Sequence, residues 1–317
     1  MAVHTKLSKT NINKILLGYK LGKYLRSKGI KEGIENTNYL IETDKSKFIL
    51  TIFENRVNKS QIPFFFEVMI NSNSCGIDCP VPIKNNNGEY VNVVKEKKMA
   101  IFNFLEGRSK KVWNDNDCFL VGEKLARFHF ANKNSTNKSK NIFGTSYWKR
   151  ILKKCENDLD RIIPNSRKII KDEISFISSN WPKNLPMGII HADLFPDNVF
   201  FQRNKISGFL DFYFSCNDFL LYDIAITLNA WCFKNKKFKE NYFNSLLRGY
   251  ESIRRISKNE KKNINIFLRG ASLRFLLTRM HDFIYINENK FVKKKNPIEF
   301  FNILLFHMKK TSKDYPF

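Results

Sequence analysis

A polar loop between two short apolar segments holds the residues whose types and spacing point to chemistry. The run GIIHADLFPDNVFF, residues 188–201, places Asp193 and Asn198 between segments that are typical of strands. An aspartate at the end of a strand can accept the proton of a hydroxyl group, and an asparagine oxygen can help to hold Mg²⁺, as phosphoryl transfer requires. We therefore predict Asp193 as the catalytic residue and Asn198 as a metal ligand. His191 is expected to shape the loop by packing and hydrogen bonding rather than to act as a general base.

A second apolar segment, ISGFL at residues 206–210, ends directly before Asp211. Asp211 is the thirteenth residue after Asn198, a spacing that suits a hairpin that brings the two side chains together. Carboxylate and amide oxygens are the ligands that Mg²⁺ prefers. Asp211 is therefore predicted as the second metal ligand.

The joint pattern resembles a known superfamily. H-x-D-x-x-x-x-N followed by D-F-Y is similar to the catalytic loop and metal segment of protein kinases, with Ala192 in place of arginine. Together with LLYDIAITL at residues 220–228, it is similar to the aminoglycoside phosphotransferase / choline kinase superfamily. The resemblance implies an α+β, two-lobed protein-kinase-like fold, with a small antiparallel-sheet N-terminal lobe and a larger, mostly helical C-terminal lobe. It also implies ATP and Mg²⁺ as cofactors, and Asp223 as a support of the catalytic loop.

Further segments resemble the bacterial homoserine kinases of this superfamily. They include KGIKEGIENTNYLIET at 28–43, NAWC at 229–232 and RGASLRFLLTR at 269–279. This resemblance implies phosphorylation of the L-homoserine hydroxyl group, the step before threonine synthase in threonine biosynthesis. The alternatives are a sister kinase acting on an aminoglycoside, choline or methylthioribose, and a non-catalytic ATP-binding pseudokinase.

The acceptor implied by the resemblance carries a carboxylate and an ammonium group. Arginine is the better carboxylate partner because its planar fork forms two parallel hydrogen bonds. Arg274 or Arg279, on one predicted helix, is expected to line the acceptor pocket, with Asp282 or Asp218 near the ammonium group and Trp231 as an apolar wall. The alternative, that these arginines lie on the surface or in ion pairs, stays open.

The nucleotide contacts are expected in the N-terminal lobe. The segment GIKEGIENTN, residues 29–38, takes the place of the phosphate-covering loop, and its glycines, such as Gly33, allow close approach of the backbone to phosphates. Asn36 in the same segment is expected to contact ATP. Backbone groups near Phe102 and Phe104 are expected to bind the adenine edge.

Thr51 marks a departure from the superfamily pattern. Most relatives have a lysine or arginine at this position, where it contacts the nucleotide phosphates. We predict that Thr51 still lines the nucleotide site, and that another cation, Arg56 or Lys31, supplies the charge or the metal ions carry more of it. Glu67 on the following helix would then lack its usual cationic partner.

Apolar spacing predicts the elements that must position these residues. Residues 1–105 are predicted as the nucleotide-binding lobe and 106–317 as the catalytic and substrate-binding lobe. The first contains helices and strands, and the second mostly helices with short strands within 188–212. In the first lobe the expected elements are a helix at 11–28, strands at 39–41, 48–53, 90–94 and 99–105, and a helix around 64–70. In the second they are helices at 115–131, 146–180, 220–233, 239–254, 260–287 and 297–309.

Composition excludes several other classes of protein. Of the 317 residues 43% are apolar, which is typical of a globular chain, and no apolar run is long enough for a membrane helix. The polar N-terminus and six scattered cysteines predict a soluble, cytoplasmic protein. The net charge of +25 is spread along the chain, so we expect no specific nucleic-acid partner, although a basic surface would attract anionic ATP. The sequence predicts no oligomeric state.

Overall fold

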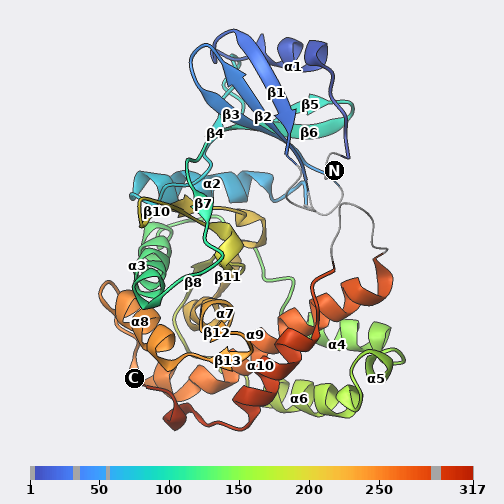
Figure 1. Ribbon diagram of the computed structural model, residues 1–317, viewed down its shortest axis with the longest axis vertical. Helices are drawn as coiled ribbons and strands as arrows, with labels where there is room; N and C mark the ends of the chain where they lie inside the picture. The colour runs from blue at the N-terminus through green and yellow to red at the C-terminus, as the bar shows by residue number, and fades with distance from the viewer. Residues whose placement is uncertain (1–3, 31–35, 55–57, 287–293, 317) are drawn as a thin grey trace. The chain divides into compact units, whose positions relative to one another are not determined.

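The computed structural model describes residues 4–30, 36–54, 58–286 and 294–316 (Figure 1). The chain divides into two compact units. One is built from residues of Met1–Glu106, and the other from residues of Gly107–Asn287 and Lys294–Phe317. Gly33, Lys31 and Arg56 lie outside the described residues.

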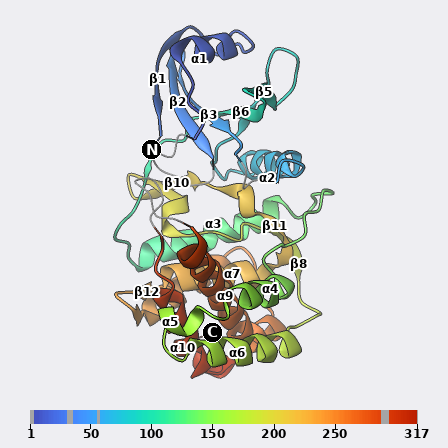
Figure 2. The ribbon, with the colours of Figure 1, turned by 90° about the vertical axis from the view of Figure 1, so that its right-hand side faces the viewer.

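The first unit is built on one antiparallel sheet in the order β1-β2-β3-β6-β4, with β5 also paired to β6. Alternation along the central strands places every second side chain on the same face. Leu50 of β3 thus faces a core that includes Ile12 of α1, whereas Phe102 of β6 faces α2, where its ring centroid lies 5.6 Å from that of Phe66. The ribbon of this sheet with α1 and α2 is drawn in Figure 2. The elements are α1 (Lys9–Leu16), β1 (Tyr24–Gly29), β2 (Thr37–Thr43), β3 (Lys47–Ile52), α2 (Ile62–Ser74), β4 (Pro82–Ile83), β5 (Asn92–Val94) and β6 (Lys97–Asn103).

The helix predicted over residues 11–28 is wrong beyond Leu16. The helix α1 ends there, and Tyr24–Gly29 forms the edge strand β1 instead. Gly22 adopts a left-handed φ of 95°, which a helix interior does not allow. The apolar spacing misled because Leu25 is 59% exposed and belongs to no buried helix face.

The second unit is mostly helical, and its predicted helices are confirmed within a few residues. The helix α3 begins where expected, because the Asn114 side chain accepts a hydrogen bond from the Asp117 amide at 3.0 Å. The helix α7 is buried on nearly all sides and packs against α9, the longest of the described helices. The helices are α3 (Asp115–Ala131), α4 (Thr145–Cys155), α5 (Leu159–Ile162), α6 (Ser166–Asn180), α7 (Leu220–Trp231), α8 (Glu240–Glu251), α9 (Lys258–Tyr285) and α10 (Ile298–Met308). None of the described helices has the length and apolar character needed to cross a membrane.

Short strands of the second unit frame the polar loop at residues 191–198. The strand before the loop, β8, pairs with β11, and the strand after it, β9, pairs with β10 and β7. Both ends of the loop are therefore fixed by strand pairing. The strands are β7 (Arg108–Ser109), β8 (Met187–Ile190), β9 (Val199–Gln202), β10 (Lys205–Phe209) and β11 (Cys216–Phe219), besides a hairpin of β12 (Phe233–Lys234) and β13 (Lys237–Phe238).

Candidate active site

The predicted hairpin that returns Asp211 to Asn198 is confirmed. Val199 of β9 pairs with Phe209 of β10, and the Leu210 amide donates to the Asn198 carbonyl oxygen at 2.9 Å. The Asn198 side-chain amide in turn donates to the Asp193 backbone carbonyl at 2.8 Å and to the Asp193 carboxylate at 3.1 Å. Asp193, Asn198 and Asp211 thus converge at one end of the β9–β10 hairpin.

Two residues of this site have left-handed backbone conformations. Ala192 has a φ of 64° and Asp211 a φ of 59°. Non-glycine residues persist in this region only when their surroundings hold them there. The Ala192 amide donates to Asp223 at 2.8 Å, and its carbonyl oxygen accepts from the Arg274 guanidinium at 2.6 Å. Side chains from α7 and α9 therefore hold both faces of the Ala192 backbone.

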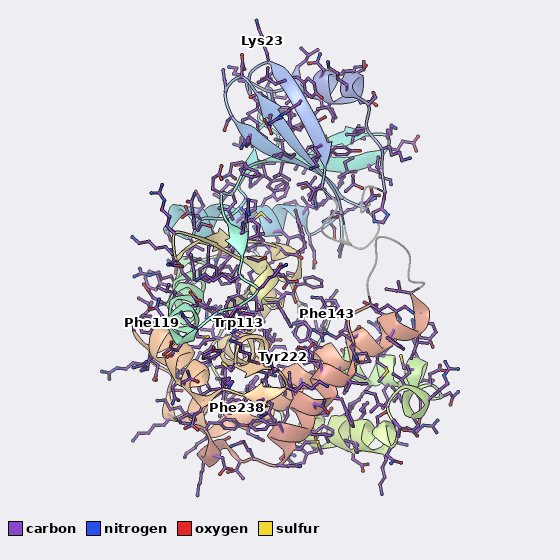
Figure 3. All side chains as sticks on the ribbon, in the orientation of Figure 1. Lys23, Trp113, Phe119, Phe143, Tyr222 and Phe238 are labelled. Carbon is purple, nitrogen blue, oxygen red and sulfur yellow. The ribbon has the colours of Figure 1, made fainter. Side chains whose placement is uncertain are left out.

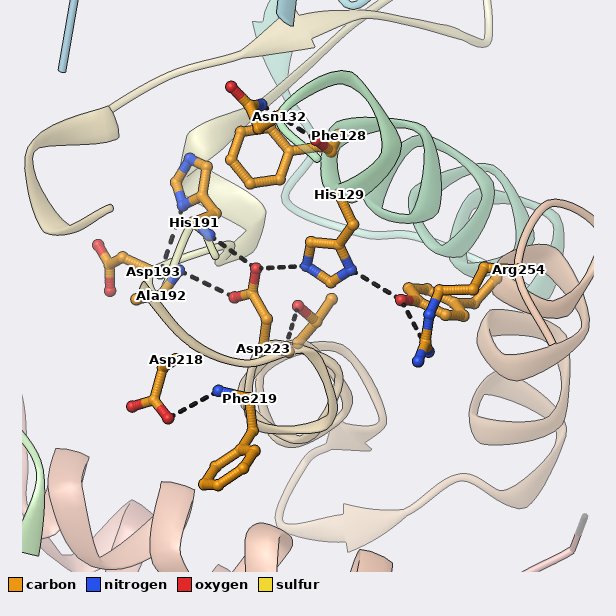
Figure 4. A network of polar contacts seen from close by, with 12 residues as sticks. Phe128, His129, Asn132, His191, Ala192, Asp193, Asp218, Phe219, Asp223 and Arg254 are labelled. Carbon is orange, nitrogen blue, oxygen red and sulfur yellow. Dashed lines mark hydrogen bonds and ion pairs between the residues drawn. The ribbon is translucent and has the colours of Figure 1, made fainter. Parts of the chain in front are cut away.

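Asp223 at the first turn of α7 gathers three hydrogen bonds beneath the loop (Figure 4). One carboxylate oxygen accepts from the His191 amide at 2.7 Å and from His129 Nε2 at 3.0 Å, and the other accepts from the Ala192 amide. Burial raises the pKa of the Asp223 carboxyl group, but the hydrogen bonds and the two histidines outweigh it, so this pKa lies below its usual value. Asp223 is therefore a buried carboxylate that fixes the backbone directly before Asp193.

The sequence analysis did not predict His129 or its partner Tyr250 as supports of the loop. His129 lies on α3, and its Nδ1 contacts the Tyr250 hydroxyl group at 2.7 Å. A histidine on the buried face of the predicted 115–131 helix was the only local signal. Its partners are 94 and 121 residues away, so no spacing rule connects them.

His191 is fully buried and bridges the loop to the end of β10. Its Nε2 contacts the Leu210 carbonyl oxygen at 2.9 Å, so Nε2 carries the proton, and Nδ1 accepts from the Asp193 amide at 3.3 Å. Burial lowers the pKa of His191. The neutral ring can therefore donate at one nitrogen and accept at the other, which fits a loop-shaping residue.

The two aspartates of the site lie in an environment that disfavours their charge. Burial raises the pKa of Asp193 well above its usual value, and the nearby charge of Asp211 raises it further. Burial, together with Asp197, raises the pKa of Asp211 to about 6. Neighbouring carboxylates that are partly withdrawn from water are costly unless a cation lies near them.

The donor set fits Mg²⁺. The Asp211 carboxylate and the Asn198 amide oxygen are hard oxygen ligands on one hairpin. Among the described residues no three histidine, cysteine, aspartate or glutamate side chains gather into a complete metal cage. Mg²⁺ is usually held by one or two protein ligands together with substrate phosphates, so a small oxygen set is what a metal–nucleotide site needs.

Trp231 and Arg274, both predicted near the acceptor, contact the backbone of the loop. Trp231 is fully buried, and its indole N–H donates to the Leu194 carbonyl oxygen at 2.9 Å. Arg274 is 2% exposed and donates to Ala192. Both therefore flank Asp193 from the side of the helices.

Arg279 and Asp282 have other surroundings. Arg279 forms an ion pair with Glu299 of α10 at 2.5 Å and donates to the Asn296 carbonyl oxygen, so the ion-paired alternative holds for this arginine. Asp282 is partly exposed, and its carboxylate lies 3.4 Å from His281 Nδ1.

The predicted nucleotide residues belong to the first unit. The Asn36 side-chain oxygen accepts from the Glu54 amide at 3.4 Å, and the Thr51 hydroxyl group donates to Asn38 at 2.7 Å. Phe102 is buried within the sheet, and Phe104 follows the end of β6, with the Lys47 ammonium group 5.6 Å from its ring centroid.

Known proteins resemble this chain along its whole length. The phosphotransferase enzyme family matches residues 27–256. The homoserine kinase of Bradyrhizobium diazoefficiens is 40% identical over 318 residues, covering 99% of this chain and 97% of the relative. The homoserine kinase of Bartonella tribocorum is 41% identical over 308 residues, covering 96% of each chain.

Solved structures confirm the predicted fold class. An amicoumacin kinase in complex with AMP-PNP and Ca²⁺ superposes with a TM-score of 0.72 at 16% identity, covering 98% of this chain and 96% of that one. A spectinomycin phosphotransferase in complex with ADP and spectinomycin superposes with a TM-score of 0.70 at 13% identity, covering 97% and 96%. At these identities the likeness shows the protein-kinase-like fold alone. Given the matches in sequence, the chain belongs to the phosphotransferase enzyme family and, within it, to the homoserine kinases.

Proposed function

We propose that this protein transfers the γ-phosphoryl group of ATP to the hydroxyl group of L-homoserine, which yields O-phospho-L-homoserine and ADP in threonine biosynthesis. The acceptor is inferred from the sequence identity of about 40% to homoserine kinases over nearly the full length of both chains. The convergence of Asp193, Asn198 and Asp211 on one hairpin supports phosphoryl transfer as the reaction.

In the proposed step the acceptor hydroxyl oxygen bonds to the γ-phosphorus of ATP. The bond from that phosphorus to the bridging oxygen of ADP breaks, and the hydroxyl proton passes to the Asp193 carboxylate. Asn198 holds this carboxylate through its side-chain amide, so the proton acceptor is oriented before the substrate binds.

The Asn198 amide oxygen and the Asp211 carboxylate would hold Mg²⁺, which neutralises charge on the ATP phosphates. Gly33, Asn36, Thr51 and the backbone near Phe102 and Phe104 stay predicted contacts to ATP. Since Thr51 is uncharged, the metal and other cations would have to balance the phosphates. We also propose a cytoplasmic location, which the six free cysteines support, because reduced thiols are typical of that compartment.

Measurement of ADP release tests the acceptor. The protein is incubated with Mg-ATP and L-homoserine, an aminoglycoside, choline or methylthioribose in parallel. We expect turnover with L-homoserine and at most traces with the others. Preference for another acceptor would contradict the proposed substrate, and no turnover with any of them would contradict kinase activity.

The Asp193→Asn variant tests the proton acceptor. We expect turnover to fall by roughly 10²- to 10⁴-fold, the usual contribution of a general base, with an unchanged melting temperature. Glu123→Gln is the matched control, because Glu123 lies in a partly exposed i,i+4 pair with Arg127 on α3. Near-normal turnover of Asp193→Asn would show that this carboxylate has no catalytic role.

A further inference from the structure

Among the described residues, Arg274 differs from the neighbouring arginines of α9 in having no carboxylate within ion-pair distance. Arg269 is paired with Glu173, and Arg279 with Glu299. Arg274 is 2% exposed, yet within the described residues no carboxylate lies within ion-pair distance of its guanidinium. A buried charge without a counter-charge costs folding free energy, which suggests that this arginine has a role in binding.

The protein uses only part of the hydrogen-bonding capacity of Arg274. Its guanidinium lies over two aromatic rings, 5.0 Å from the centroid of Phe143 and 4.6 Å from that of Phe275. In the described part of the chain its one hydrogen bond of good geometry goes to Ala192, whereas a guanidinium has five N–H donors. The ring contacts restrict the position of the guanidinium, and its remaining N–H groups can donate hydrogen bonds to another acceptor.

A second buried polar group lies beside this guanidinium. Burial raises the pKa of the Tyr222 hydroxyl group (Tyr222 is labelled in Figure 3), and Arg274 and Asp218 lie near enough for their charges to act on it as well. Tyr222 is 1% exposed, and its oxygen makes no hydrogen bond of good geometry to any described residue. The buried polar groups of Arg274 and Tyr222 therefore lie near each other in the second unit.

Asp218 supplies the opposite charge at this place. Its carboxylate accepts from the Asn141 side chain at 2.6 Å and from the Phe219 amide at 2.7 Å, which fix its orientation. The charge of Arg274 acts on it, but the two groups are too far apart to form an ion pair. In Figure 4 the carboxylates of Asp218 and Asp193 both point to the side of the loop away from His129.

This arrangement matches a zwitterion with a hydroxyl group nearby. In 2-amino-4-hydroxybutanoate the carboxylate and the ammonium group share one carbon, and the extended chain places the hydroxyl oxygen about 5 Å from the carboxylate carbon. Arg274 contacts Ala192, the residue directly before Asp193, so a carboxylate on Arg274 leaves the hydroxyl group within reach of Asp193. Asp282 lies eight residues beyond Arg274, about 12 Å along the helix axis, which is too far for a group on the same carbon.

We propose that Arg274 binds the carboxylate of the amino-acid acceptor and that Asp218 binds its ammonium group, an inference that rests on the proposed function. Arg274 and Asp218 thereby set the acceptor specificity. Tyr222 donates a further hydrogen bond to the same carboxylate.

Acceptors that lack one charged group test each residue separately. The compounds are L-homoserine, 3-amino-1-propanol, which lacks the carboxylate, and 4-hydroxybutanoate, which lacks the ammonium group. We expect Arg274→Met to lower kcat/KM for L-homoserine by roughly 10- to 150-fold relative to its effect on 3-amino-1-propanol, as for a charged hydrogen bond. Asp218→Asn should likewise lower kcat/KM for L-homoserine by roughly 10- to 150-fold relative to its effect on 4-hydroxybutanoate.

Comparison between acceptors separates binding from loop support. Arg274→Met also removes the donor to Ala192, but that loss lowers turnover of every acceptor by the same factor and cancels in the ratio. Arg274→Lys, which keeps the charge, should recover part of the selectivity. Arg279→Met is the matched control on the same helix, and it should leave the ratio unchanged because Arg279 is paired with Glu299.

Three outcomes would overturn the proposal. Equal losses for L-homoserine and 3-amino-1-propanol in Arg274→Met would assign Arg274 to loop support alone, even while the wild-type protein phosphorylates L-homoserine. If the truncated acceptors react too slowly, competitive inhibition by L-2-aminobutyrate and by propylamine replaces turnover, and equal changes in the two inhibition constants would contradict the subsite. No turnover of L-homoserine by the wild-type protein would reject the proposed function and the subsite with it.

Discussion

At the scale of residues, the loop around Asp193 is held by side chains from distant helices. Asp223 binds the amides of His191 and Ala192, Arg274 binds the Ala192 carbonyl oxygen, and Trp231 binds that of Leu194. Each contact acts on the backbone, so none depends on the rotamer of Asp193. The loop is therefore preorganised around the proposed proton acceptor, which lowers the cost of ordering it during reaction.

Replacement of Asp223 tests this preorganisation. We expect Asp223→Asn to lower the free energy of unfolding by roughly 3–5 kcal/mol, because an amide presents one oxygen where three donors now converge on a buried carboxylate. Turnover should fall as well, since Ala192 loses the partner that holds its left-handed backbone. Urea titration gives the first quantity and ADP release the second. Glu123→Gln should change stability by no more than about 0.5 kcal/mol, and equal stability of both variants would refute this role of Asp223.

His307 is expected to make stability depend on pH. It is fully buried on α10, where Nδ1 contacts the Tyr315 hydroxyl group at 2.7 Å and Nε2 contacts Asn229 at 2.8 Å. Burial lowers the pKa of His307 to about 3, below the value of about 6.5 in an unfolded chain. Between these values the unfolded state binds more protons. The contribution of neutral His307 is therefore complete above about pH 6.5 and is lost as pH falls toward 3.

Urea unfolding at pH 6.5 and pH 5 measures this contribution. We expect the wild-type protein to lose about 2 kcal/mol more than His307→Gln over this interval, because the neutral amide has no proton to gain. Taking the difference between the two proteins cancels every other titrating group. Parallel pH curves would show that His307 does not titrate as inferred.

At the scale of elements, α3 and α8 approach each other through glycines. A Cβ atom on Gly249 would lie 1.9 Å from the Phe119 carbonyl oxygen, and one on Gly122 would lie 2.0 Å from that of Leu246. Both neighbours are backbone atoms, which cannot rotate away. The pairing brings His129 of α3 and Tyr250 of α8 within hydrogen-bond distance, so this close approach also supports the contact behind Asp223.

The Gly249→Ala variant tests the close approach. We expect a loss of unfolding free energy at or above the upper end of the roughly 1–3 kcal/mol that overpacking usually costs, since the two helices must separate. The control is Asn241→Ala on the exposed face of the same helix, where alanine is neutral or slightly stabilising. Thermal unfolding compares the two variants. A melting temperature of Gly249→Ala equal to that of the control would contradict the packing.

The elements that sequence predicts best are those with strong local signals. The helix α3 begins at the predicted residue 115, where Asn114 caps it through hydrogen bonds between residues no more than three positions apart. The strand β1 has no such signal. It is an edge strand with largely exposed side chains, so it lacks the alternation that identifies a half-buried strand. The two-residue strands β7, β12 and β13 were missed because they exist only through pairing with a partner strand.

At the scale of the whole molecule, the site combines residues whose positions follow from local sequence signals with residues whose positions depend on long-range packing. Asp193, Asn198 and Asp211 lie on one strand–loop–hairpin segment, and their convergence follows from local spacing. The contact between Arg274 and Ala192 spans 82 residues, and it depends on how α9 packs beneath the loop. The sequence alone therefore shows Arg274 on a predicted helix but does not identify Ala192 as its partner. Local spacing therefore predicts the reacting groups, whereas the long-range contacts that hold the loop become visible only in the folded structure.

The net charge of +25 leads to a prediction about the whole molecule. A positive field raises the local concentration of anionic ATP but has little effect on L-homoserine, whose charges sum to zero. When ionic strength rises from about 0.01 to about 0.15 M, the screening length falls from about 30 to about 8 Å. We expect KM for ATP to rise roughly 3- to 10-fold over this range at saturating Mg²⁺, with KM for L-homoserine changing less than about twofold. Steady-state kinetics with each substrate varied in turn measures both, and L-homoserine serves as the internal control. If KM for ATP stays constant, the excess of lysine and arginine has no part in nucleotide capture.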